Sequence, residues 1–246
     1  MFNLSGKVAL VTGSSRGLGL AIAELLSQCG CRVMLCSRSE PDLQQAQAYL
    51  RSTHPAAEIL YSQVDLTDEN SVERLFSTVH GHWGVVDICV NNAGMLKQRP
   101  IVDMTLAAWH EMINANLTSA FLCSRAMMRG ATATQSKKAI VNISSLSGIA
   151  GVEKFTDMSA YIASKHAVVG LTESLAVEGA SNNVAANCVA PGAINTRMFQ
   201  ENFPDYDVTT TPADIANQVL PFCNINNPAL PTGEVLPIYC NNEAMS

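Results

Sequence analysis

The sequence predicts an α/β fold: a single doubly wound, Rossmann-like domain with a seven-stranded, mostly parallel sheet and helices on both faces. Short apolar segments alternate with longer segments of helical periodicity along the 246 residues, which is typical of βαβ units. The apolar segments show little polar alternation, as strands buried on both faces do. Hydrophobic residues make up 48% of the chain, enough for a sizeable core. No repeat or linker interrupts the pattern, so we expect residues 1–246 to form one domain.

The expected strands are the apolar segments between turns. They span residues 8–11, 32–36, 59–64, 87–91, 139–143, 185–189 and 235–239. Helical periodicity fills the intervals at residues 19–29, 43–51, 72–80, 117–128 and 161–177. Residues 195–211 break this alternation because they are polar, rich in turn formers and interspersed with aromatic residues. We expect a short substrate lid there.

The first strand runs into a glycine-rich turn, in the sequence VALVTGSSRGLG at residues 8–19. Glycines permit a tight turn and a close approach to a pyrophosphate, and the N-terminal amides of the following helix point at that anion. The spacing GxxxGxG differs from the common GxGxxG, and a purely structural turn is the alternative. The expected dinucleotide-binding residues of this loop are Gly13, Ser15, Arg16, Gly17, Leu18 and Gly19.

The end of the second strand indicates which dinucleotide binds. Sites for NAD place an acid there to hold the ribose 2′-hydroxyl. Here Ser37 and Arg38 occupy the tip, and Glu40 lies beyond it, beside Pro41, where the next helix starts. Arg38 can pair with a 2′-phosphate, and Arg16 can reach the same group. Two arginines and no acid at the tip predict NADP(H), unless the arginines are simply solvated surface residues.

Tyr161 and Lys165 stand four positions apart in the helical sequence SAYIASKHAV. This spacing places both side chains on one helix face. A nearby ammonium group stabilises a phenolate and lowers the tyrosine pKa from its ordinary value of ~10. The pair is therefore suited to proton transfer. A long helix can also carry this spacing by chance, so the rest of the chain must decide.

Three further motifs complete a pattern. These are NNAG at residues 91–94, NANL at 114–117 and VNISS at 141–145. Together with TGxxxGxG and YxxxK, in this order, they resemble the short-chain dehydrogenase/reductase family. The resemblance runs from about Lys7 to Thr196, and PADIA and TGEVL near the C-terminus also fit it.

The resemblance implies four catalytic residues. The family tyrosine and lysine fall on Tyr161 and Lys165, and its active-site asparagine falls on Asn116. The family serine falls on Ser145, which matches the pattern better than Ser144. In the family the serine polarises the substrate carbonyl, and the tyrosine delivers a proton as hydride arrives from the nicotinamide. The lysine lowers the tyrosine pKa and holds the nicotinamide ribose, and the asparagine helps to anchor a water that links the lysine to solvent.

The resemblance also implies contacts to the cofactor. Asp65 and Leu66 would face the adenine, and Asn92 would lie along the adenosine. Ile194 and Thr196 would border the nicotinamide carboxamide. For Asp65 the alternative is a helix cap, because the sequence DLTDEN also has the form of a helix start.

Two departures from the family concern the substrate side. The interval from Ser145 to Tyr161 is longer than usual, and the extra residues near GVEKFTDMSA are expected at the substrate rim. The lid is short and carries Met198, Phe199, Phe203 and Tyr206. These residues either line an apolar, open pocket that orders when ligand binds, or pin the loop to the body of the protein.

We therefore expect an NADP(H)-dependent oxidoreductase that transfers hydride between nicotinamide and a carbonyl or alcohol, above all a ketoreductase for an apolar or carrier-bound ketone. The alternatives are an NAD-dependent alcohol dehydrogenase and a non-catalytic nucleotide-binding module. A net charge of −6 argues against nucleic acid as a partner. The sequence lacks a signal-like segment and an apolar run of ~18 residues, so we expect a cytoplasmic protein without membrane association.

The eight cysteines contain no CxxC pair and no histidine at ligand spacing. We expect reduced thiols, mostly buried, and no metal site. His80 and His82 are expected in a loop at a helix end. The helices at 117–128 and 161–177 carry many small and apolar residues, and in the family these helices pack against a second subunit. A homo-oligomer, dimer or tetramer, is therefore expected.

Overall fold

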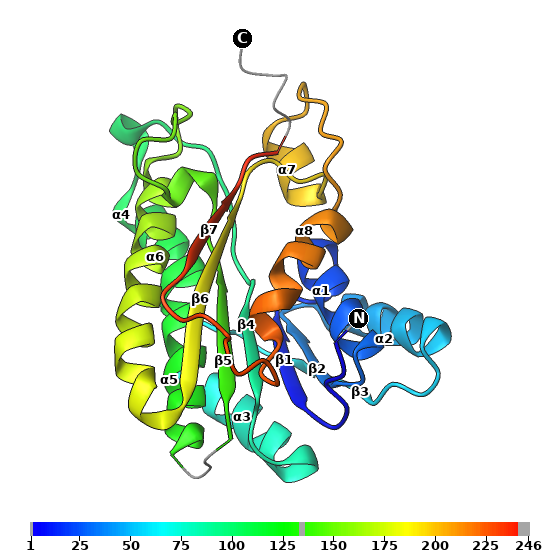
Figure 1. Cartoon of the computed structure of the whole chain (residues 1–246). Helices are drawn as coiled ribbons and strands as arrows, with labels where there is room; N and C mark the ends of the chain where they lie inside the picture. Colours follow the sequence, from blue (N-terminus) through cyan, green and yellow to red (C-terminus); the bar gives the residue numbers. More distant parts are fainter. Residues whose placement is uncertain (1, 133–135, 241–246) are drawn as a thin grey trace.

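The computed structural model describes residues 2–132 and 136–240 and confirms the predicted α/β fold (Figure 1). In this part of the chain seven strands form one sheet in the order β3-β2-β1-β4-β5-β6-β7, and all neighbouring pairs are parallel. Every strand overlaps a predicted segment. The strands are β1 (Val8–Thr12), β2 (Arg32–Ser37), β3 (Ile59–Gln63), β4 (Ile88–Asn91), β5 (Lys138–Ile143), β6 (Val184–Pro191) and β7 (Val235–Ile238). Residues 241–246, the end of the expected domain, lie outside the described residues.

Five of the helices lie on segments that periodicity predicts. These are α1 (Gly17–Gln28), α2 (Glu40–Thr53), α3 (Glu69–Trp83), α5 (Ser119–Ala131) and α6 (Ser159–Gly179). The shorter helices α4 (Leu106–Ile113), α7 (Arg197–Asn202) and α8 (Pro212–Val219) were not predicted. The expectation of a loop at His80 and His82 is wrong, because α3 continues through both to Gly84, whose φ of 91° ends it.

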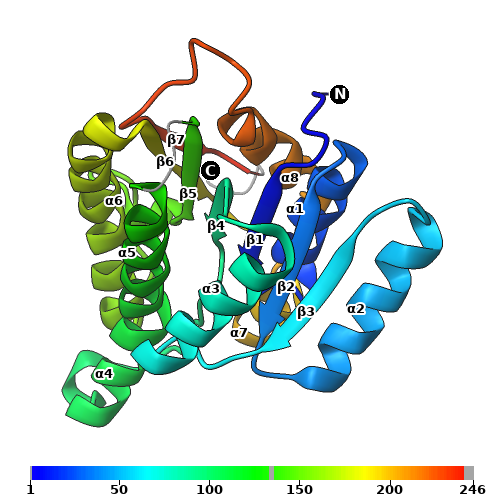
Figure 2. The ribbon, with the colours of Figure 1, turned by 90° about the horizontal axis from the view of Figure 1, so that it is seen from below.

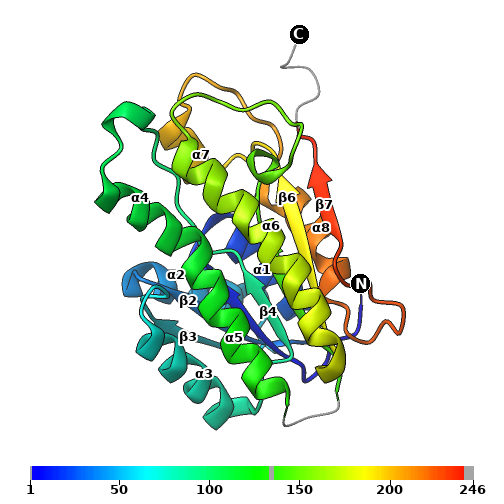
Figure 3. The ribbon, with the colours of Figure 1, turned by 90° about the vertical axis from the view of Figure 1, so that its left-hand side faces the viewer.

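Helices cover both faces of the sheet (Figure 2). Side chains of β1 alternate between two apolar layers: Ala9 and Val11 face one, Val8 and Leu10 the other. Helices α1, α2 and α8 contribute to the first layer, and α3, α5 and α6 to the second. Helices α5 and α6 lie side by side on their face (Figure 3). Because the sheet is buried on both faces, the sequences of its strands are nearly continuous apolar runs.

The strand order places a topological switch point between β1 and β4. The chain moves outward from β1 to β3 and then returns to β4 beside β1. In open parallel sheets, ligands bind outside the carboxyl ends of the strands at such a point. The glycine-rich loop after β1 and the NNAG motif after β4 therefore meet at one edge of the sheet.

All eight cysteines are free thiols, and seven are buried. Cys240 is only half-buried because it lies just beyond the last strand at the sheet edge. Within the described residues, no helix is long and apolar enough to cross a membrane.

Candidate active site

A cleft of about 460 Å³ opens at the carboxyl ends of the strands around the switch point. It gathers the predicted site residues from seven separate stretches of sequence. Lining it are Gly13, Ser15, Arg16, Gly17, Leu18, Gly19, Ser37, Arg38, Asp65, Leu66, Asn92, Ser145, Tyr161, Lys165, Ile194 and Thr196. Asn116 is not part of the lining and lies buried nearby. In the described residues no cluster of His, Cys, Asp and Glu side chains is able to hold a metal ion.

The glycine-rich loop packs directly against the loop after β4. Gly13 has a φ of 63°, and a Cβ there would lie 2.9 Å from Cα of Ala93. A Cβ at Gly19 would collide with the carbonyl oxygen of Gly13 and lie 2.5 Å from Nδ2 of Asn92. Side chains are thus excluded from the floor of the cleft, which leaves room for a ligand to approach the backbone.

Thr12 and Asn92 tie these two loops together. The Thr12 hydroxyl accepts hydrogen bonds from the backbone N–H groups of Asn92 and Ala93, both at 2.9 Å. The Asn92 amide in turn donates to the carbonyl oxygens of Thr12 and Gly13, at 2.9 and 3.2 Å. Sequence reasoning placed Asn92 but missed Thr12, although Thr12 is the first residue of the TGxxxGxG motif. The pair fixes the floor of the cleft.

The N-terminus of α1 fits a dinucleotide phosphate. Arg16 is the N-cap, no side chain caps the helix, and its first turn holds no acid. The first amides of a twelve-residue helix are therefore not satisfied by the protein's own side chains and face the cleft. Free N-terminal amides and the helix dipole favour an anion there.

Ser145, Tyr161 and Lys165 meet at the other end of the cleft. Ser145 follows β5, and the two other residues lie one turn apart on α6. The Ser145 hydroxyl lies close enough to the Tyr161 hydroxyl to lower the pKa of Tyr161. The ammonium group of Lys165 lies 5.7 Å from the centre of the Tyr161 ring and donates to the carbonyl oxygen of Ile143 at 2.9 Å. Two hydroxyls and an ammonium group thus gather at this end of the cleft.

The pKa of Tyr161 departs from expectation. Loss of hydration raises the pKa of this hydroxyl above its ordinary value and outweighs the effect of the nearby Ser145 hydroxyl, which lowers it. The expectation of a lowered pKa is therefore wrong for the protein alone. Burial also lowers the pKa of Lys165 to about 8, because an ammonium group in this environment loses water.

The two serines of the VNISS motif have different surroundings. Ser144 is buried, and its hydroxyl donates to the backbone carbonyl of Lys165 at 2.8 Å. The Ser145 hydroxyl faces Tyr161 and accepts from the backbone N–H of Ser147 at 3.1 Å. Ser144 thus anchors α6 to the sheet, and Ser145 is the hydroxyl that a ligand beside Tyr161 can reach.

Asn116 lies in a π-helical turn, Asn114–Thr118, between α4 and α5. Its carbonyl oxygen accepts from the backbone N–H of Met95 at 2.7 Å, and its amide donates to Met95 O and to the Ser164 hydroxyl. Both amide donors are committed to the protein, so this side chain holds the loop after β4 against α6. Sequence reasoning missed Ser164, which stands three residues after Tyr161.

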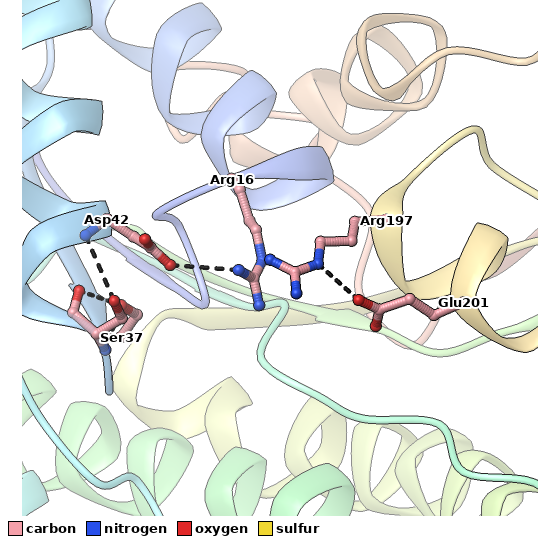
Figure 4. Close-up of polar contacts among 6 residues, drawn as sticks. Arg16, Ser37, Asp42, Arg197 and Glu201 are labelled. Carbon is pink, nitrogen blue, oxygen red and sulfur yellow. Dashed lines mark hydrogen bonds and ion pairs between the residues drawn. The ribbon is translucent and has the colours of Figure 1, made fainter.

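At the opposite end, the tip of β2 is exposed. Arg38 lies on the surface of the cleft, whereas Arg16 pairs with Asp42 of α2 at 3.2 Å (Figure 4). Asp42 was not considered in the sequence because it follows the strand tip by several residues, yet the first turn of α2 brings it into the cleft. Asp65 accepts from the backbone and hydroxyl of Thr67, and Asp68 rather than Asp65 caps α3.

Above the cleft, the lid contains the short helix α7 and a cluster of aromatic rings. Phe199 stacks on Phe203 with ring centres 5.0 Å apart, and Phe203 meets Tyr206 edge-on at 5.9 Å. Phe155, from the long interval between Ser145 and Tyr161, lies 5.7 Å from Phe203. These contacts favour the pinned loop of the two alternatives, although Met198 and Phe199 also line the cleft.

A glycine-floored cleft at the switch point of a parallel sheet, with hydroxyls and an ammonium group at one end, defines a dinucleotide-binding oxidoreductase site. The chain belongs to the short-chain dehydrogenase/reductase family: residues 7–207 match the family model for short chain dehydrogenase. This confirms the resemblance found in the sequence.

Among curated relatives, 3-oxoacyl-[acyl-carrier-protein] reductase FabG of Vibrio harveyi is 35% identical over 246 residues, which cover 96% of this chain and 97% of the relative. The protein of that name from Escherichia coli K12 is 36% identical over 196 residues, or 80% and 77% of the two chains. Among solved structures, a short-chain type dehydrogenase/reductase from Mycobacterium marinum has a TM-score of 0.90 at 28% identity, with 99% and 98% coverage. Levodione reductase has a TM-score of 0.88 at 29% identity and 100% coverage of both chains.

Proposed function

We propose that the protein is an NADPH-dependent ketoreductase that acts on 3-oxoacyl thioesters held on a carrier. The observation that supports this most is the approach of Ser145, Tyr161 and Lys165 to one another at the end of a cleft with a glycine floor. The 3-oxoacyl reductases that align with 96% and 80% of this chain favour the substrate class.

When bound in this cleft, a nicotinamide cofactor would supply the hydride that reduces the carbonyl carbon. The Ser145 hydroxyl donates to the substrate carbonyl oxygen and orients it toward Tyr161. Tyr161 gives its proton to that oxygen as negative charge develops there. Its raised pKa in the protein alone keeps the hydroxyl protonated and ready to act as an acid. The Lys165 ammonium lies close enough to stabilise the resulting phenolate.

We assign Asn116 a positioning role, because its side chain holds other parts of the site in place. Its three hydrogen bonds hold the π-helical turn and the loop after β4 against α6. Lys165 itself is held by the carbonyl oxygen of Ile143. We propose that the family's water relay runs past this turn rather than from the Asn116 amide, whose donors are already used.

The choice of NADPH rests on Arg38 and Arg16. Arg38 is exposed at the surface of the cleft, where its guanidinium can meet a 2′-phosphate. Arg16 has only an exposed ion pair with Asp42, and such pairs are weak enough to exchange for a phosphate. Asp42 is also the one observation that favours the alternative of NAD, because a carboxylate here can accept from a ribose 2′-hydroxyl.

The lid over residues 195–211 and the rim at Phe155 suit an apolar chain. Met198 and Phe199 line the cleft, and Met198 and Tyr206 keep 41% and 55% of their surfaces exposed. We propose that this apolar wall receives the acyl chain while the thioester end lies toward solvent, where a carrier remains attached.

Consumption of NADPH with 3-oxoacyl thioesters tests the proposal. We expect turnover with 3-oxoacyl groups on a carrier protein or on pantetheine, and much less with small polar sugars. Turnover with none of a broad set of ketones, in a protein that still binds NADPH, would instead support the non-catalytic module.

We further propose that the protein is a homo-oligomer through α5 and α6. These helices lie side by side and expose Phe121 and Val177, with 41% and 79% of their surfaces accessible (Figure 3). Light scattering at micromolar concentration should give a dimer or tetramer, and Phe121→Glu should lower that mass. A monomer in the unsubstituted protein would contradict the proposal.

A further inference from the structure

Two arginines approach each other across the mouth of the cleft. Arg16 comes from the glycine-rich loop and Arg197 from the first turn of α7 in the lid, and their guanidinium groups point toward one another (Figure 4). Each is paired on its far side with an acid. Arg16 Nη1 lies 3.2 Å from Asp42 Oδ2, and Arg197 Nε lies 2.6 Å from Glu201 Oε1.

These two ion pairs leave most N–H donors of Arg16 and Arg197 available. Each guanidinium carries five N–H groups, and each of the two ion pairs uses one nitrogen. Both pairs are highly exposed, with 60% of the Arg16 and 68% of the Arg197 side-chain surface accessible. Exposed pairs of this kind contribute little stability. Two like charges that face each other form a favourable place for an anion between them.

The lid helix begins beside the pyrophosphate-binding part of the loop. A Cβ placed on Gly17 would lie 3.6 Å from Cγ2 of Thr196, the N-cap of α7. Arg197 is the next residue, whereas Arg38 lies at the tip of β2, where the 2′-phosphate is expected. Arg197 therefore faces the part that NADPH and NADH share, rather than the group that distinguishes them.

We propose that Arg197 is a cofactor-binding residue that closes the lid onto the dinucleotide pyrophosphate, opposite Arg16. On binding, the phosphate oxygens take up the free donors of both guanidiniums, and the contact couples α7 to the glycine-rich loop. Arg197 then strengthens binding of NADPH and NADH alike, whereas Arg38 distinguishes them at the 2′-phosphate. The inference rests on the proposed function only in taking the ligand to be a nicotinamide dinucleotide.

Calorimetric titration with ADP-ribose and 2′-phospho-ADP-ribose tests this without turnover, because both carry the pyrophosphate and neither carries the nicotinamide. Arg197→Gln should weaken both ligands by the same factor, about tenfold. Arg197→Lys, which keeps the charge but loses the planar fork, should lose less. Arg38→Ala should weaken only the ligand with the 2′-phosphate.

The chain offers a matched control pair. Arg32 and Glu58 also form an exposed Nε–carboxylate pair, at 3.0 Å, at the start of β2 and away from the cleft. Arg32→Gln should change both affinities by less than about twofold, because screening removes long-range effects. Glu201→Gln should tighten both ligands about twofold, since it frees Arg197, and Glu58→Gln should not.

Three results would overturn the inference. Equal affinities of Arg197→Gln and the unsubstituted protein would mean that Arg197 only pairs with Glu201 on the helix surface. If Arg197→Gln weakens the binding of 2′-phospho-ADP-ribose but not of ADP-ribose, Arg197 lies at the 2′-phosphate. Absence of binding of both ligands by the unsubstituted protein would remove both the inference and the proposed function, whereas the first two results leave the proposed function standing.

Discussion

At one end of the cleft, Lys165 and Asn116 are buried and committed to hydrogen bonds with the backbone at Ile143 and Met95. At the other end, Arg16 and Arg38 are exposed, and Arg16 forms an ion pair with Asp42. The first end is fixed before any ligand arrives. The second is free to rearrange, because the Arg16–Asp42 pair is exposed and can exchange for a phosphate.

This difference in burial suits the two tasks of the cleft, which are proton transfer and selection between cofactors. Proton transfer requires groups within hydrogen-bond reach and in fixed orientation, so small displacements are costly. Selection between cofactors requires only a net gain from charge-assisted bonds at the surface. Substitutions at the fixed end should therefore reduce kcat, and substitutions at the exposed end should change affinity.

The largest effect is expected for Tyr161→Phe. The variant keeps the ring over which Lys165 lies but loses the hydroxyl that transfers the proton, so kcat should fall ~10²–10⁴-fold. Steady-state turnover with circular dichroism as a folding check measures this. Tyr61→Phe, at a partly buried tyrosine on β3, is the control and should keep its rate. Near-normal kcat in folded Tyr161→Phe would exclude the assignment.

Ser145→Ala should come next. Loss of one donor to the substrate oxygen typically costs ~10²–10³ in rate, while Ser144→Ala should mainly affect stability because its hydroxyl supports α6. Comparison of kcat and melting temperature for both variants separates the roles. A larger rate loss in Ser144→Ala would show that the wrong serine was chosen.

Arg38→Ala should weaken NADPH tenfold to a hundredfold, since a charge-assisted hydrogen bond contributes ~1.5–3 kcal/mol. NADH affinity should remain close to its original value. Fluorescence titration of both cofactors measures the change. If the unsubstituted protein binds NADPH and NADH with equal affinity, Arg38 and Arg16 face solvent and do not contact the 2′-phosphate.

The pH profile of ketone reduction should show the titration of Lys165. With its pKa lowered to about 8 by burial, the ammonium is present below that pH and is lost above it. The rate should then fall about tenfold per pH unit beyond 8. Lys165→Arg, which stays charged, should move the decline to higher pH. A flat profile up to the ordinary lysine pKa of ~10.4 would contradict the role.

Asp42→Asn should have the smallest effect. The substitution frees Arg16 and removes a negative charge from the cleft, so NADPH affinity should rise about threefold. A loss of NADH affinity in the same variant would favour the alternative in which Asp42 accepts from the ribose hydroxyl. Titration of the two cofactors decides between these outcomes.

The sequence predicts the fold and the buried end of the site well, and the exposed end less well. Strands buried on both faces leave continuous apolar runs, and YxxxK places Tyr161 and Lys165 on one helix face. The short helix α7 leaves no periodic signal, so the approach of Arg197 to Arg16 could not be foreseen. Asp42 was missed because its position depends on where α2 begins relative to the cleft. The sign of the Tyr161 pKa shift depends on burial, which spacing alone does not give.

The central claim is that the two ends of the cleft act separately. Single-turnover reduction at saturating NADPH, measured together with NADPH affinity for Tyr161→Phe and Arg38→Ala, tests it most directly. The account predicts that Tyr161→Phe binds NADPH normally and loses the chemical step, whereas Arg38→Ala binds weakly and, once saturated, reacts at close to the original rate. A saturated Arg38→Ala protein as slow as Tyr161→Phe would contradict the account.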